Sequence, residues 1–248
     1  MIRIALFLLF VLPALALSVP AAAHARHAPK ALVELSVIDR DSAVTLPVHT
    51  RDGQRYIEGQ PGRRYAVRLT NRTGARVLAV LSVDGINAVS GQTADPSQAG
   101  YVLGPYQSTD ITGWRKSLEE VAAFQFAPLT ESYAARTGRA GNVGVIGIAV
   151  FHERHVIPPP PAIADGAMPA HAMRAPAPVA QSIGTAHGQR EQSLVNRTRF
   201  ERASRHPAEV ASLRYDRREN LIALGVIPPR PGGPRHPDPF PGGFVPDP

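Results

Sequence analysis

The feature that most constrains the fold of this chain is where its prolines fall. The chain has 248 residues and 25 prolines, and 17 of these lie between residues 156 and 248. Four of them are consecutive, at 158–161. Such a run favours extended polyproline II structure and cannot join a sheet ladder. A sizeable core is therefore expected before residue 156, and 156–182 is expected to be a Pro/Ala-rich linker.

Residues 31–155 show the alternation of apolar and polar side chains that is typical of β-strands. Val33, Leu35 and Val37, for example, alternate with Glu34 and Ser36. Several such stretches follow along the chain, with turn residues between them. The pattern predicts an all-β domain over 31–155, a single β-sandwich of the Ig-like or jelly-roll-like kind.

Two turns within this domain can be placed from their residues. Asp52-Gly53 is expected to join strands at 44–50 and 55–58. The Asn-Arg-Thr-Gly stretch at 71–74 is expected to join the strands within 63–83 into a second hairpin. Its second strand, the apolar run 77–83, is expected to be the more buried of the two, and Asp84-Gly85 ends it.

The C-terminal part contains a further segment with regular structure, at 183–227. Residues 193–202 have strand character, 207–215 could pair with them, and 217–224 suits a short helix with Gly225 at its C-terminal cap. Because so short a segment cannot bury its own core, we expect it to dock on the sandwich. Residues 228–248 are rich in Pro and Gly and are expected to form a disordered tail.

The N-terminus has the pattern of a secretory signal peptide over residues 1–25. Arg3 precedes an apolar run, and Ala23-His24-Ala25 supplies small residues before the cleavage point. The chain has no Cys, so disulfides and thiolate metal sites are excluded. These features favour a bacterial protein of the periplasm or the medium, with no transmembrane segment after signal cleavage.

The charge of the chain is positive but evenly spread. The formal net charge is +7, and residues 26–155 and 156–248 each carry +3. No basic run is interleaved with aromatic residues, which is the pattern that nucleic-acid binding would require. We therefore expect no nucleic-acid partner.

Several stretches resemble a group of uncharacterised secreted proteobacterial proteins. The resemblance covers about residues 60–154 and rests on five strings: RYAVRLTNRTG (64–74), VLSVDGIN (80–87), GWRKS (113–117), SYAARTG (132–138) and NVGVIG (142–147). It implies a bacterial source and export to the envelope. No activity, and therefore no catalytic residue, comes with it.

The most promising region for function is the aromatic stretch 101–116. Tyr106, Trp114 and Arg115 lie in it, and Tyr133 follows on the next segment. Aromatic rings beside an arginine can stack on a sugar or anchor a protein partner. The alternative is that Trp114, the only Trp of the chain, and the tyrosines cap the core. The candidate binding residues are therefore Trp114, Arg115, Tyr106 and Tyr133, with an envelope protein or a glycan as the expected partner.

No catalytic motif is recognisable. The most metal-like string has His152 and His155 three residues apart, a spacing that places them on opposite faces of a continuing strand, so no metal or cofactor is expected. The chain also lacks a Gly-x-Ser-x-Gly nucleophile motif. The sequence favours a non-enzymatic binding or assembly module of the envelope, with a carbohydrate-active or metal-assisted hydrolase as the alternative.

Overall fold

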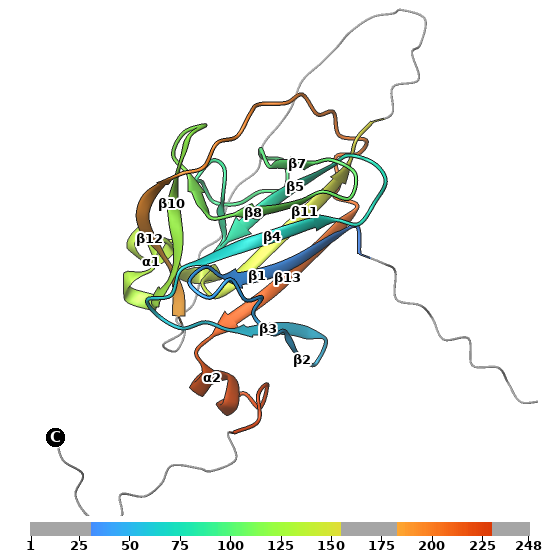
Figure 1. Cartoon of the computed structure of the whole chain (residues 1–248). Coiled ribbons are helices and arrows are strands. Elements are labelled where there is room, and N and C mark those ends of the chain that lie inside the picture. The colour runs from blue at the N-terminus through green and yellow to red at the C-terminus, as the bar shows by residue number, and fades with distance from the viewer. Residues whose placement is uncertain (1–30, 155–182, 230–248) are drawn as a thin grey trace, which may run out of the picture. The chain divides into compact units, whose positions relative to one another are not determined.

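The computed structural model describes residues 31–154 and 183–229, and Figure 1 shows that strands dominate them. The all-β class expected from the alternation is therefore confirmed. The expected signal peptide and linker, His155 and nearly all of the expected C-terminal tail lie outside the described residues. Within the described part, no helix combines the length and the apolar character needed to cross a membrane.

The strands of the described residues form three sheets. The first has the order β1 (Val33–Asp39), β4 (Tyr65–Asn71) and β8 (Ser108–Ile111). The second has the order β12 (Ile183–Gln192), β10 (Glu120–Pro128) and β9 (Gly113–Arg115). The third is seven-stranded: β2 (His49–Arg51), β3 (Gln54–Glu58), β13 (Glu209–Asp216), β11 (Val145–His152), β5 (Val77–Val83) and β6 (Ile86–Asn87) follow in that order, and β7 (Tyr101–Leu103) also pairs with β5.

Within residues 31–154 and 183–229, helical structure is limited to short segments. These are two single 3-10 turns at Leu129–Glu131 and Ala140–Asn142, α1 (Tyr133–Arg136) and α2 (Arg218–Ala223). α2 agrees with the helix expected at 217–224. It ends as expected before Gly225, whose φ of 65° is the left-handed conformation that glycine adopts at low cost.

The three sheets contribute to one main core. Alternate side chains of β1 and β4 are buried in the same cluster as alternate side chains of β5 and β11, so Leu35 and Leu81 share one interior although they belong to different sheets. Phe124 of the second sheet lies in this cluster as well. β5 is apolar on both faces because Leu78 and Val80 belong to a second, smaller cluster on its other side.

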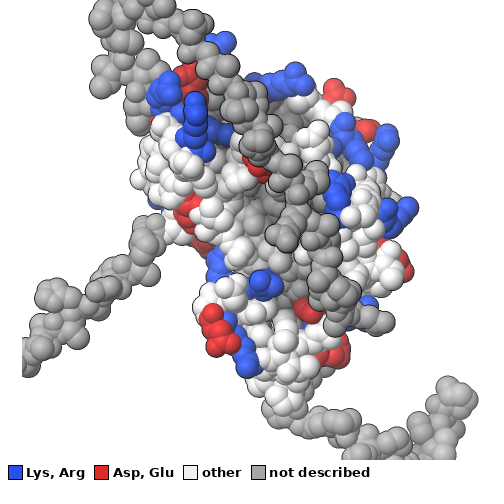
Figure 2. Space-filling model, turned by 180° about the vertical axis from the view of Figure 1, so that it is seen from behind, with Lys and Arg blue, Asp and Glu red and all other residues white. Residues whose placement is uncertain are grey.

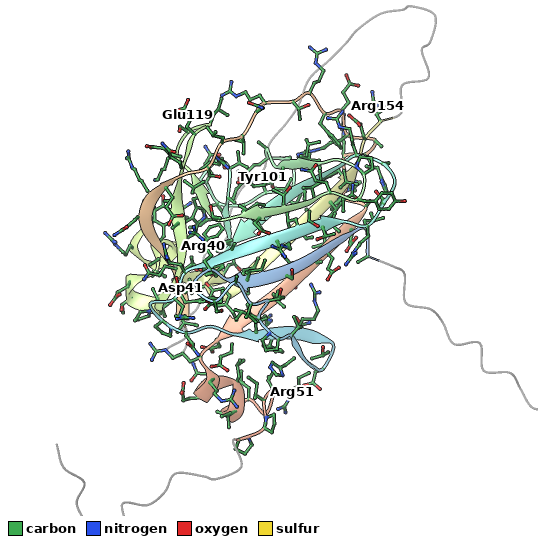
Figure 3. The ribbon with its side chains drawn as sticks, in the orientation of Figure 1. Arg40, Asp41, Arg51, Tyr101, Glu119 and Arg154 are labelled. Carbon is green, nitrogen blue, oxygen red and sulfur yellow. The ribbon has the colours of Figure 1, made fainter. Side chains whose placement is uncertain are left out.

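The second sheet is joined to the first by main-chain contacts and ion pairs. Phe126 donates its N–H to the Arg63 carbonyl at 3.0 Å. Glu191 of β12 accepts from Arg40 at 2.6 Å and from Arg64 at 3.4 Å. Figure 3 shows Arg40 at this junction. These ion pairs are partly exposed, so they orient the sheets more than they stabilise them.

The segment from residue 183 onward supplies inner strands of the structure. β13 lies between β3 and β11, antiparallel to β11 and parallel to β3. β12 runs antiparallel along β10 for almost its whole length. The prediction of a strand at 193–202 is wrong, because the strand lies at 183–192. The predicted pairing of 207–215 with 193–202 is wrong as well, because β13 pairs with β11 and β3.

The hairpin expected within 63–83 is also wrong, whereas the one around Asp52-Gly53 is confirmed. β4 pairs with β1 and β8, and β5 pairs with β11, β6 and β7, so the two strands belong to different sheets. The side chain of Asn71 organises the crossing between them. It donates to the carbonyls of Ala75 and Gly104, both at 2.7 Å, and accepts from the Thr73 N–H at 2.9 Å.

A chain of buried hydrogen bonds crosses the interior and ends at Asp84. The Tyr215 hydroxyl donates to Asp84 Oδ1 at 2.5 Å, and Thr185 Oγ1 lies 2.7 Å from Tyr215 Oη and 2.6 Å from Tyr65 Oη. A carboxylate only accepts, and each hydroxyl has one proton. The direction of donation is therefore Tyr65 to Thr185 to Tyr215 to Asp84.

The backbone holds Asp84 in this position. Its Oδ1 accepts from the Gly144 N–H at 2.9 Å and its Oδ2 from the Thr185 N–H at 2.6 Å. Asp84 and Gly85 both have positive φ, 54° and 74°, as the two-residue turn between β5 and β6 requires. Complete burial raises the pKa of Asp84 to about 6, although the hydrogen bonds from Tyr215, Thr185 and Gly144 act in the opposite direction.

Replacing Tyr215 by Phe is expected to lower the free energy of unfolding by about 1–3 kcal/mol, because it removes a donor to Asp84 and the acceptor of the Thr185 hydroxyl. Urea denaturation at pH 7 measures the change. Tyr56→Phe, in β3 and outside this hydrogen-bond chain, is the matched control and should stay within about 0.5 kcal/mol of wild type. Equal effects of the two substitutions would show that the buried chain does not stabilise the fold.

The raised pKa of Asp84 also predicts a pH dependence. The folded chain keeps the Asp84 proton between about pH 4 and pH 6, where an unfolded Asp has lost it, so the unfolding free energy should fall as the pH rises through this window. The fall amounts to about 3 kcal/mol relative to Asp84→Asn, which has no such proton. Urea titrations at pH 4, 5, 6 and 7 test this. Parallel pH profiles for the two proteins would contradict it.

Candidate functional site

The four residues proposed from the sequence do not form one surface. Trp114 lies in the main core with 2% of its surface exposed. Its ring meets Phe124 edge-on at 4.9 Å and Tyr133 at 5.3 Å between centroids. This position corresponds to the alternative in which Trp114 caps the core.

Arg115 points away from Trp114 because successive residues of a strand face opposite sides. β9 contains both residues and pairs with β10. The residue before them, Gly113, has no positive φ, so the backbone conformation of the strand does not require glycine there. Close approach of the two strands requires it instead, because a Cβ at this position would overlap the Ala122 carbonyl oxygen of β10.

The two tyrosines are also separated. Tyr133 belongs to α1, where its ring packs on Trp114 and His187, and the Arg139 guanidinium lies 5.7 Å from the ring centre. Tyr106 is 71% exposed in a turn with a φ of 55°, and its side chain lies over Gly74. Of the four residues, Trp114 and Tyr133 contact each other, while Arg115 and Tyr106 lie elsewhere.

The structure nevertheless places much of the stretch 101–116 around a groove, and this groove is the candidate site. Its cavity volume is about 780 Å³, within the range of small-molecule sites. Its described lining residues are Val89, 99–103, Gln107, Thr109, 115–118 and 194–198. Of the residues proposed from the sequence, Arg115 alone belongs to this groove.

One wall of the groove is the stretch that follows β12. The N–H groups of Ser193 and Val195 donate to the carbonyls of Glu119 and Leu118, at 2.6 and 2.9 Å. The Arg115 guanidinium donates to the Ser193 carbonyl and, at 2.7 Å, to its hydroxyl. Figure 3 shows Tyr101 below this crossing stretch, with Glu119 beside it. Sequence reasoning missed this wall because nothing local indicates where 193–198 crosses.

Two polar atoms of the groove, Tyr101 Oη and Arg115 Nε, are buried without a hydrogen bond of ordinary geometry. Burial raises the pKa of Tyr101, and the charge of Arg115 and a hydrogen bond with its side chain both oppose this rise. Buried polar groups in native proteins are rarely left unpaired, since each costs about 1–3 kcal/mol. A phenol oxygen accepts as well as donates, so the Arg115 side chain is itself a partner of the Tyr101 hydroxyl.

The groove is also positively charged. Its described lining residues include Arg115, Lys116 and Arg197 but no Asp or Glu. None of these three cations makes an ion pair with a carboxylate of the described residues. Elsewhere charges are mixed, and Figure 2 shows basic side chains at several separate places on one face, with acidic ones between them.

Two other features of the described residues are weaker candidates. A hollow of about 300 Å³ lies over β5 and β11, but its lining is mostly apolar and includes none of the unpaired polar atoms. No group of three or more His, Asp or Glu within the described ranges could hold a metal ion. His152 is the exposed last residue of β11.

Comparison of the chain with protein-family models, with curated proteins and with solved structures found no match.

The core position of Trp114 gives a stability prediction. Trp114→Ala is expected to lower the unfolding free energy by about 3–5 kcal/mol, because it leaves a cavity between Phe124 and Tyr133. Trp114→Phe should cost clearly less, since the ring still fills most of the space and the indole N–H, which is unpaired here, is removed. Thermal and urea unfolding measure both variants. A fully stable Trp114→Ala would show that the ring is not a core residue.

Proposed function

We propose that this chain is an exported bacterial protein of the periplasm or the medium that acts as a non-enzymatic binding or assembly module of the envelope. Its binding site is the groove between 99–118 and 194–198. The single observation that carries the proposal is the cationic lining of the groove, in which Arg115, Lys116 and Arg197 lie without a carboxylate among the described lining residues. A ligand with a negatively charged group would balance these cations.

The architecture supports a binding role in a second way. We propose that the sheets make a single β-sandwich with a Pro-rich C-terminal extension, and such a frame holds loops rigidly at its ends. The groove is lined by residues of β7, β8 and β9 and by connecting segments, and main-chain hydrogen bonds at Glu119 and Leu118 fix its wall. The ligand in the groove would be an envelope protein or a glycan, or a chemical group that one of these carries.

The hydrolase alternative receives less support. Glycosidases use two carboxyl groups about 5–9 Å apart across a cleft. The described lining of the larger groove contains no carboxylate, and the smaller hollow contains only Asp95. No observation favours acid–base or metal-assisted hydrolysis at either place.

The test is co-sedimentation of the purified full chain with isolated envelope fractions at low and high salt. Wild type is expected to pellet under both conditions, because the contact is specific and partly apolar. Leu194→Asp should reduce the pelleted fraction at least about fivefold, since it places a negative charge at the rim of the cationic groove. Leu194 is 82% exposed, so the substitution leaves the core intact.

Leu224→Asp is the matched control, because Leu224 is 52% exposed at the end of α2 and outside the groove. It should pellet like wild type. If both variants behave alike, or if modest salt abolishes all binding, the attraction is only the net positive charge meeting anionic lipid, and the proposal fails.

A further inference from the structure

We propose that the groove binds an acidic segment of a partner protein, which adds a strand to the free edge of β8 and turns its acidic side chains toward the cations of the groove. This partner class rests on the proposed function, because it assumes that the groove is the binding site. Three features lead to it: the unpaired edge of β8, the position of that edge beside the groove, and the charge of the lining.

β8 has a hydrogen-bonding partner on one side only. Within the described residues it pairs with β4 and stands last in its sheet. The Asn71 N–H donates to the Gln107 carbonyl at 2.9 Å, just before β8 begins. Main-chain groups alternate in direction along an antiparallel strand, so those of Thr109 also point toward β4, whereas those of Ser108 and Asp110 point away from it. The N–H and C=O groups of these two exposed residues are therefore open to a further strand.

The other edge of the same sheet is protected. Main-chain hydrogen bonds of 2.8 and 2.9 Å join the stretch 44–46 to Val37 and Asp39 of β1. β8 has no such cover within the described residues, and it contains neither Lys nor Pro, with which proteins commonly prevent strand addition. The charge of Asp110 is balanced by Arg68 at 2.6 Å. The edge of β8 is thus able to accept a strand.

A strand added to β8 would lie along the groove. Thr109 pairs with Leu69, whose side chain belongs to the main core, so the two side chains share the inner face of the sheet. Thr109 lines the groove, and so do all three residues of β7, which belongs to the seven-stranded sheet. Successive side chains of a strand face opposite sides, so every second side chain of the added strand would point into the groove.

The charge of the lining determines which side chains the groove favours there. Lys116 and Arg197 are exposed and make no ion pair with a carboxylate of the described residues, so both can contact an acidic side chain. The Arg115 guanidinium is bonded to Ser193, and it contributes its positive charge alone. Electrostatic complementarity of this kind selects an acidic partner.

The main-chain groups favour a peptide over a glycan. Donors and acceptors along the edge of β8 repeat at the spacing of a neighbouring strand, and a peptide in extended conformation matches that spacing. In this mode of recognition, main-chain hydrogen bonds supply affinity and alternate side chains supply specificity. Because β8 is only four residues long, a short peptide is sufficient to test it.

The probe is a capped hexapeptide of alternating Thr and Glu, added to the purified full chain. Alternation places all of its Glu side chains on one face of a strand. Titration calorimetry should show it binding at least about tenfold more tightly than the same peptide with Lys in place of Glu. Equal binding of the two peptides would overturn the acidic partner.

N-methylation of the probe tests the main-chain pairing. One version carries N-methyl groups on its Glu residues and the other on its Thr residues, so each loses the N–H donors of one edge only. Only one edge of the peptide can face β8. One version should therefore bind at least about tenfold more weakly than the unmodified probe, and the other within about threefold of it. Equal binding of the two versions, whether strong or weak, would overturn strand addition.

Arg197→Glu is expected to weaken binding of the Thr/Glu probe at least about threefold, because it reverses one charge of the lining. Arg205→Glu is the matched control, since Arg205 is also exposed after β12 but lies outside the groove. It should bind the probe like wild type. Both positions are exposed, so both variants should unfold like wild type. If the two variants bind the probe alike, the acidic side chains do not face this lining.

The outcomes separate the two proposals. Envelope binding that depends on Leu194, without binding of the Thr/Glu probe, would reject this partner class and leave the proposed function standing. Binding of the probe without any envelope binding would sustain strand addition and reject the envelope role. An oligogalacturonate that binds more tightly than the probe would assign the groove to an acidic glycan and overturn the peptide partner.

Discussion

The fold depends on the carboxyl group of Asp84, which is buried in the interior, where a charged group is least stable. Asp84 sits at the tight turn after β5 and receives hydrogen bonds from β12, from β13 and from the residue just before β11. Through Thr185 the same chain of hydroxyls reaches Tyr65 in β4. Segments from all three sheets and from both sides of the linker therefore meet at one polar centre. Because an unpaired polar group at this depth is costly, the centre favours one arrangement of these strands over others.

This arrangement also positions the candidate site. β12 begins at the polar centre, runs along β10, and leads directly into the wall at 193–198. Arg115 contacts that wall from β9, on the other side of β10. The groove is thus a consequence of how the strands after the linker join those before it. Arg115 lies in β9 and Tyr101 in β7, so sheet pairing positions these two side chains, whereas Arg197 lies in the stretch that follows β12.

Local patterns predicted part of this structure well. Alternation identified β1 and β4, the Asp-Gly pair at 52–53 identified its hairpin, and Gly225 marked the end of α2. From the stretch 101–116 the sequence proposed Tyr106, Trp114 and Arg115, and the structure brings only Arg115 to the groove. Trp114 is buried in the core, because a strand places these two neighbours on opposite sides. Partners distant in the sequence were not predictable. A turn such as 71–74 can join two strands of one sheet or cross between sheets, and the difference lies in the buried contacts of Asn71. The wall at 193–198 depends in the same way on main-chain bonds to Leu118 and Glu119.

The central claim is that the groove between 99–118 and 194–198 binds an acidic ligand in a frame held by the buried polar centre. Hydrogen–deuterium exchange of the full chain, with and without the hexapeptide of alternating Thr and Glu, tests it most directly. The account predicts slower exchange confined to peptides that cover 99–118 and 193–198, with peptides of α2 unchanged. Protection that is absent, or that falls on the hollow over β5 and β11 instead, would contradict it.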